Sequence, residues 1–145
     1  MSSLQAAGLT GMSETTSTPT TVTNLGVAMF TVADQDAALA FYTEKLGYEL
    51  RVDVTFGEDG ESRWLEVAPP GSTARLALNP PMGPNQPGGG GIGVETADLQ
   101  AEYERLSAIG GIDVNPPMDA PGAPKLFMMS DPDGNVIAVV EVPAA

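Results

Sequence analysis

Three side chains near the middle of the chain have the chemistry to recognise or act on a small molecule. Trp64 is the only tryptophan, Glu66 follows it by two residues, and Arg75 comes nine residues later. Side chains at i and i+2 of a strand share a face, so a strand here places the indole beside the carboxylate. A glutamate is rarely buried unpaired, so this face is either exposed or functional. Glu66 is a candidate general base, and Arg75 either anchors an anionic group or neutralises Glu66.

The chain contains no histidine and no cysteine, which limits its chemistry further. Thiol nucleophiles, zinc–thiolate sites, Ser-His-Asp triads and imidazole-bound metals are excluded. Any acid or base must be a carboxylate, a tyrosine or a lysine whose pKa is moved by its surroundings.

Composition narrows the classes of partner. The 145 residues, 42% of them hydrophobic, suit one domain or two half-domains with a shared core. Nineteen acidic against six basic side chains give a net charge of −13, which opposes binding to nucleic acid or anionic lipid. No apolar run approaches the roughly 20 residues of a membrane helix. A neutral or cationic small molecule fits this charge better.

The first part of the chain predicts an arm followed by one βαβββ module. Residues 1–22 are rich in Ser and Thr and resemble no secretory signal, so we expect a flexible arm and a cytoplasmic location. In 23–80 a strand over 25–32 places Val27 and Met29 on one face, and Asp34 caps a helix that ends at Gly47. Three strands follow, over 49–55, 63–68 and 75–78.

The second part repeats this order. Residues 81–91 continue a stretch rich in Pro and Gly, which predicts a linker. In 92–145 a strand leads to a helix capped by Asp98, a short strand at 112–114, and a hairpin around the turn DPDGN at 131–135. The predicted fold class is α+β, with paired βαβββ modules forming a curved mixed sheet around a U-shaped cleft.

Four segments carry a family resemblance: VADQDAALAFYTEKLGYEL, RWLEVAPPGS, GIGVETADLQAEYERL and SDPDGNVIAVVE. They resemble the vicinal oxygen chelate superfamily, the group of glyoxalases, bleomycin-resistance proteins and extradiol dioxygenases, over about residues 24–142. The resemblance implies paired modules around a pocket, commonly completed across a homodimer.

Metal-dependent members of that superfamily place His or Glu at four strand positions facing the pocket. Carried over to this chain, these positions fall on Val27, Ala77, Gly91 and Ala138. Hard cations need several converging oxygen ligands. The side chains at these four positions carry no oxygen or nitrogen atom, so none of them can coordinate a cation. This departure from the family's pattern predicts an apolar cleft with no metal and no cofactor.

The expected cleft lining combines these positions with the residues singled out above. Methionine side chains adapt to irregular ligands, and Phe127 and Met129 share one face of the penultimate strand. The expected ligand-binding residues are Val27, Met29, Trp64, Glu66, Arg75, Phe127, Met129 and Ala138.

Four functions remain open from the sequence. The first is a metal-independent protein that binds or sequesters an apolar or aromatic compound between its modules, as a homodimer. The second is a metal-independent isomerase or lyase with Glu66 as general base. The third is a metal-dependent lyase or dioxygenase with a displaced carboxylate site. The fourth is an interaction module whose cleft is filled by its own side chains. Fold alone does not choose among them.

Overall fold

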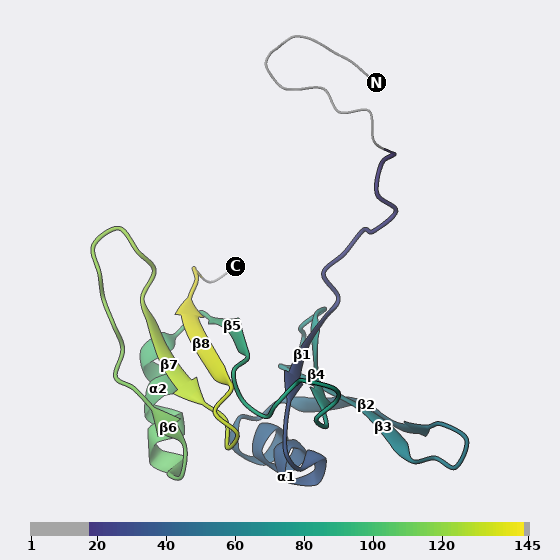
Figure 1. Ribbon diagram of the computed structural model, residues 1–145. Helices are drawn as coiled ribbons and strands as arrows, with labels where there is room; N and C mark the ends of the chain where they lie inside the picture. The colour runs from purple at the N-terminus through teal and green to yellow at the C-terminus, as the bar shows by residue number, and fades with distance from the viewer. Residues whose placement is uncertain (1–17, 144–145) are drawn as a thin grey trace.

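The computed structural model describes residues 18–143, and the first 17 residues of the expected arm lie outside this range (Figure 1). The first module contains β1 (Val27–Thr31), α1 (Gln35–Ala40), the π-helix η1 (Phe41–Lys45), β2 (Glu49–Phe56), β3 (Ser62–Ala68) and β4 (Arg75–Asn79). The second contains β5 (Gly91–Thr96), α2 (Leu99–Ile109), β6 (Asp113–Val114), β7 (Leu126–Ser130) and β8 (Val136–Glu141). Within the described range, no helix is long and apolar enough to cross a bilayer.

The two sheets have the same strand order. The first runs β1-β4-β3-β2 and the second β5-β8-β7-β6. The first strand of each module pairs in parallel with the last, β1 with β4 and β5 with β8, and all other pairs are antiparallel. This repeated arrangement confirms the predicted α+β class with paired βαβββ modules. β1 and β5 are therefore the edge strands of their sheets, and β5 begins at Gly91, the last residue of the expected linker.

Both helices begin where the sequence predicted. The Asp34 carboxylate accepts a hydrogen bond from the Ala37 amide at 3.0 Å, and Asp98 accepts one from Ala101 at 3.1 Å. These bonds satisfy amides that have no partner within the helix. The first helix ends differently from the single α-helix expected, since its last turn widens into η1 before Gly47, which has a φ of 80°.

One hydrophobic core lies between the helices and the inner face of each sheet, and it is continuous across both modules. Its largest fully buried apolar side chains are Tyr42, Phe30, Phe127, Leu65, Leu78, Leu99, Leu106 and Ile137. Alternation along each strand sends every second side chain into this core. The remaining side chains form the outer face of each sheet, turned away from the helices.

The DPDGN turn carries the main polar contact between the modules, which we call the inter-module hydrogen-bond cluster. Asn135, fully buried, donates from Nδ2 to the Thr31 carbonyl at 3.0 Å and accepts at Oδ1 from the Gly90 amide at 3.0 Å. The Tyr42 hydroxyl donates to Asp131 Oδ2 at 2.9 Å. Buried polar groups are costly unless paired, so these bonds fix the second module against the first.

Close packing beside this cluster requires a glycine at position 90. A Cβ on Gly90 would stand 2.6 Å from Cδ1 of the buried Phe30 ring. A side chain at this position would push the linker away from β1, so the approach of the two modules requires glycine.

Two tyrosines lie side by side beneath the sheets, with ring centroids of Tyr42 and Tyr48 5.8 Å apart. Burial raises the pKa of Tyr42 far above its ordinary value, and the charge of Asp131 and its hydrogen bond raise it further. Burial also raises the pKa of Tyr48 to about 12, with Glu102 adding to the rise and Arg105 opposing it. Both hydroxyls therefore keep their protons in the folded protein at neutral pH.

Replacing Asn135 by Ala tests the inter-module hydrogen-bond cluster. Asn135→Ala removes a fully buried side chain and leaves the partly buried Gly90 amide without its acceptor, so we expect the free energy of unfolding to fall by about 2–3 kcal/mol. Urea denaturation followed by circular dichroism measures this loss. Asn115→Ala, at an exposed asparagine, is the matched control and changes stability by less than about 0.5 kcal/mol. Equal losses in the two variants would contradict the role given to the cluster.

The tyrosine pair predicts a fall in stability at high pH. The unfolded chain loses tyrosine protons above about pH 10, whereas folded Tyr42 and Tyr48 hold theirs. Unfolding then releases protons, so stability is complete below pH 10 and decreases by about 1.4 kcal/mol per pH unit for each tyrosine above it. Urea midpoints from pH 8.5 to 11.5 test this. The double replacement of Tyr42 and Tyr48 by Phe flattens the profile, and an unchanged slope would refute the assignment.

Candidate functional site

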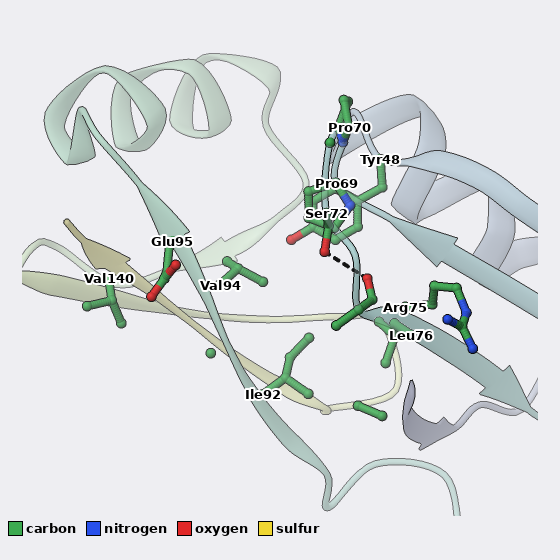
Figure 2. Close-up of a pocket in the computed structure, with 14 residues that line it drawn as sticks. Tyr48, Pro69, Pro70, Ser72, Arg75, Leu76, Ile92, Val94, Glu95 and Val140 are labelled. Atoms are coloured by element: carbon green, nitrogen blue, oxygen red, sulfur yellow. Dashed lines mark hydrogen bonds between the residues drawn. The ribbon is translucent and has the colours of Figure 1, made fainter. Parts of the chain in front are cut away.

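A cavity of about 710 Å³ lies between the two modules (Figure 2). One wall comes from β1, β4 and the turn that joins β3 to β4, and the other comes from the edge strand β5 and its neighbour β8. The lining residues are Ala28, Tyr48, Pro69, Pro70, Gly71, Ser72, Ala74, Arg75, Leu76, Ile92, Gly93, Val94, Glu95 and Val140. This inter-module cavity has the size of a small-molecule site.

The walls of the inter-module cavity are mainly apolar, with a few polar groups. Figure 2 shows Ile92 and Val94 on one side facing Leu76 and the two prolines on the other. The Ser72 hydroxyl is engaged, since it donates to the Ala74 carbonyl at 2.7 Å. Glu95 is exposed and forms no ion pair within residues 18–143.

Tyr48 adds a neutral polar group to the lining. Its pKa of about 12 keeps the hydroxyl protonated, so it can donate a hydrogen bond at physiological pH. No side-chain hydrogen bond of this hydroxyl is formed within the described part of the chain. Tyr48 therefore presents an uncommitted donor beside apolar walls.

Trp64, Glu66 and Arg75 form a second polar group, on the outer face of the first sheet. Glu66 is 4% exposed, and its two carboxylate oxygens have different partners. Oε1 accepts from Arg75 Nε at 2.7 Å, and Oε2 accepts from the indole Nε1 of Trp64 at 2.7 Å. The alternation that placed Trp64 and Glu66 on one face is thus observed, with Arg75 beside them.

This arrangement bears on Glu66 as a general base. Both oxygens already accept strong hydrogen bonds, one of them charge-assisted. A proton taken up by Glu66 would turn an acceptor into a donor that faces another N–H group, so one of these bonds would be lost. The geometry favours Glu66 as a residue that positions Arg75 and Trp64 over Glu66 as a base.

The other expected residues of the first module lie on the same outer face. Val27 and Met29 are 36% and 61% exposed, and they pair across the β1–β4 ladder with Arg75 and Ala77. Of the eight residues expected to bind ligand, only Arg75 also lines the inter-module cavity. Ala138 lies on the outer face of the second sheet, where it pairs with Gly93 and Met128.

Phe127 and Met129 lie on the face of β7 that meets the core. They are 0% and 3% exposed and belong to the hydrophobic core, where the Phe127 ring packs 5.7 Å from that of Tyr103. Met129 also lines a smaller cavity beside Tyr48 and Pro69, so the binding role expected for these two residues stays a prediction. The segment LFMMS is apolar on both faces, so alternation alone does not show which face meets the core. In the structure, Met128 shares the outer face with Ala138.

Sequence reasoning missed most of the residues that line the inter-module cavity. Ile92 and Val94 were assigned only to a strand, and Pro69, Pro70 and Ser72 only to a turn. No residue type among them signals binding. Their common feature is position, because the cavity depends on how the two edge strands approach, which no local pattern encodes.

The four positions that the family resemblance assigns to metal ligands do not fit a cation here. Val27 and Ala77 lie on the outer face of the first sheet, and Gly91 and Ala138 on that of the second, with no oxygen or nitrogen donor in any side chain. In the part of the chain that the structure describes, no three His, Cys, Asp or Glu side chains are grouped to hold a metal.

The chain is similar to one protein family and to several individual proteins. Residues 24–139 match the family described as Glyoxalase/Bleomycin resistance protein/Dioxygenase superfamily. The protein YetH of Bacillus subtilis is 30% identical over 122 residues, which cover 83% of this chain and 99% of YetH. The structure of TnmS3, an antibiotic binding protein from Streptomyces sp. CB03234, is 33% identical with a TM-score of 0.75, and the match covers 87% of this chain and all of TnmS3. A superfamily member from Sphaerobacter thermophilus is 31% identical with a TM-score of 0.73, covering 83% of this chain and 98% of that one.

Proposed function

This chain belongs to the Glyoxalase/Bleomycin resistance protein/Dioxygenase superfamily, and we propose that within it the protein binds a small apolar or aromatic compound between its two modules. The observation that carries the proposal is the inter-module cavity of about 710 Å³, with its mainly apolar walls. Ligand sites are commonly apolar clefts of this size with a few polar groups. The similarity to TnmS3, an antibiotic binding protein, supports the same class of function.

Binding without catalysis is the form of this proposal that the polar groups support. Glu66 already accepts two hydrogen bonds, and Tyr48 keeps its proton at neutral pH. A catalytic acid or base needs a proton affinity matched to the working pH and access to the substrate. Metal independence is part of the same proposal, because the four carried-over positions supply no donor atoms.

The ligand we propose is neutral or cationic. The net charge of −13 repels anions at long range, and the carboxylate of Glu95, without an ion pair among residues 18–143, stands at the inter-module cavity. The same repulsion makes nucleic acid an unsuitable partner.

We also propose a homodimer in which a second copy covers the outer face of the first sheet. Four large apolar side chains are exposed on this face, Val27 at 36%, Met29 at 61%, and Val54 and Phe56 at 52% each. The first two are on β1 and the other two on β2, so apolar groups are exposed at both edges of this face, and exposed apolar surface often marks an interface. The resemblance to the vicinal oxygen chelate superfamily also implies a homodimer.

Gly93→Val tests binding in the inter-module cavity. Gly93 lines this cavity, has no positive φ, and a Cβ built on it meets no atom within 4 Å. The valine therefore enters open space without strain and narrows the site. We expect the affinity for the neutral fluorescent probe N-phenyl-1-naphthylamine to fall at least about tenfold, equivalent to about 1.4 kcal/mol. Fluorescence titration measures the Kd.

Gly91→Val is the matched control, because Gly91 occupies the same strand but does not line the inter-module cavity. Its Kd should stay within about twofold of that of the native protein, and both proteins should give the same Kd in EDTA. If Gly93→Val and Gly91→Val weaken probe binding equally, the proposed site is contradicted. If binding is lost in EDTA, its independence from metal is contradicted.

Met29→Asp tests the homodimer. A charge on the apolar part of the proposed interface must be buried there, so the dimer dissociation constant should rise at least about a hundredfold. Sedimentation velocity should give twice the 14.9 kDa chain mass for the native protein and the single mass for Met29→Asp. Met82→Asp, at a methionine 55% exposed in the linker, should remain dimeric. A native protein that sediments as a monomer would rule the assembly out.

A further inference from the structure

Arg75 connects the inter-module cavity to the outer face of the first sheet. It lines the cavity, yet its guanidinium bonds to Glu66 on the outer face. Figure 2 shows the Arg75 side chain beyond Leu76, at the rim of the cavity and directed away from Ile92. The side chain is 38% exposed, so solvent or a ligand substituent at the rim can reach it.

The bond between Arg75 and Glu66 uses one guanidinium nitrogen, Nε. Arginine–carboxylate pairs are frequently bidentate, with two nitrogens facing two oxygens. Here the second carboxylate oxygen, Oε2, is already occupied by the indole N–H of Trp64. Within residues 18–143, the two terminal nitrogens of Arg75 form no hydrogen bond. Trp64 therefore leaves the terminal N–H groups of Arg75 available.

We infer that Arg75 is a hydrogen-bond donor subsite for a carbonyl-type oxygen on an aromatic ligand, and that Trp64 keeps this subsite open. The inference rests on the proposed binding function and specifies its ligand class. The apolar body of the ligand occupies the inter-module cavity, and its oxygen reaches the rim. Since Nε is tied to Glu66, the planar guanidinium is already oriented, which lowers the entropy cost of the new bond.

The charges around the subsite select a neutral acceptor over a carboxylate. Glu66 neutralises Arg75, so the pair offers N–H donors with no net charge. On the opposite wall, Glu95 has no ionic partner among the residues described, and the whole chain carries −13. For an anionic ligand, this repulsion would offset the binding free energy gained from the contact with Arg75.

A matched pair of three-ring compounds tests the subsite. Xanthone and xanthene differ by a carbonyl in place of a methylene group, so their affinity ratio isolates the acceptor oxygen. Equilibrium dialysis with the native protein should give about tenfold tighter binding for xanthone, as expected for a bond to a charged donor. Arg75→Met removes the donor and keeps an unbranched apolar stem, and it should bring the ratio to about one.

Trp64→Phe tests the role of the indole, at a residue that does not line the inter-module cavity. Without the indole N–H, Oε2 of Glu66 can accept a second hydrogen bond from Arg75, and the ion pair becomes bidentate. We expect the xanthone preference to fall to about twofold or less while xanthene binding is unchanged. Phe56→Leu, on the same hairpin and 52% exposed, is the control and should keep the full preference. Thermal midpoints confirm that each variant is folded.

The outcomes separate this inference from the proposed function. Equal binding of both compounds by the native protein, with both lost in Gly93→Val, overturns the Arg75 subsite and leaves the binding function standing. A preference that survives in Trp64→Phe overturns the role of the indole. If neither compound binds the native protein, both the subsite and the proposed binding function fail.

Discussion

The buried hydrogen bonds of Asn135 are the constraint on which the rest of the structure depends. This side chain is fully buried between the modules, and it satisfies the Gly90 amide and the Thr31 carbonyl at once. A second tie comes from Arg105 on α2, which donates to the Leu46 carbonyl at the end of η1 at 2.9 Å. None of these side chains lines the inter-module cavity. The modules are thus fixed to each other elsewhere, and β1 and β5 remain far enough apart to leave a cavity between them.

The local elements were predictable because their signals are local. Asp34 and Asp98 each satisfy an amide three residues ahead, and the strands alternate as their apolar residues require. Alternation also placed Trp64 beside Glu66. It placed Phe127 and Met129 on one shared face but left open which face meets the core, because the segment is apolar on both faces. The cavity lining was not predictable either, since it arises where two edge strands distant in sequence approach each other.

The outer faces show how a fold can keep its architecture while its chemistry changes. Val27, Ala77, Gly91 and Ala138, the positions that the family resemblance assigns to metal donors, lie on strands whose β ladders they continue. Small apolar groups at these positions leave the sheet geometry intact, because the ladder depends on backbone bonds. The carboxylate that remains nearby, Glu66, is held by Trp64 and Arg75. Its contribution to binding is therefore indirect, through the orientation that it gives to Arg75.

The pair of Glu66 and Arg75 also connects the two surfaces proposed for a ligand and for a second copy. Glu66 lies on the outer face of the first sheet, and Arg75 reaches from that face to the inter-module cavity. A second copy that covers the face would remove water from the pair, and hydrogen bonds strengthen as the local dielectric falls. A donor that is already oriented and shielded needs little reorganisation when it meets an acceptor oxygen. Glu66 and Arg75 therefore stand at the border between the two proposed surfaces, and a contact made at either surface bears on the same ion pair.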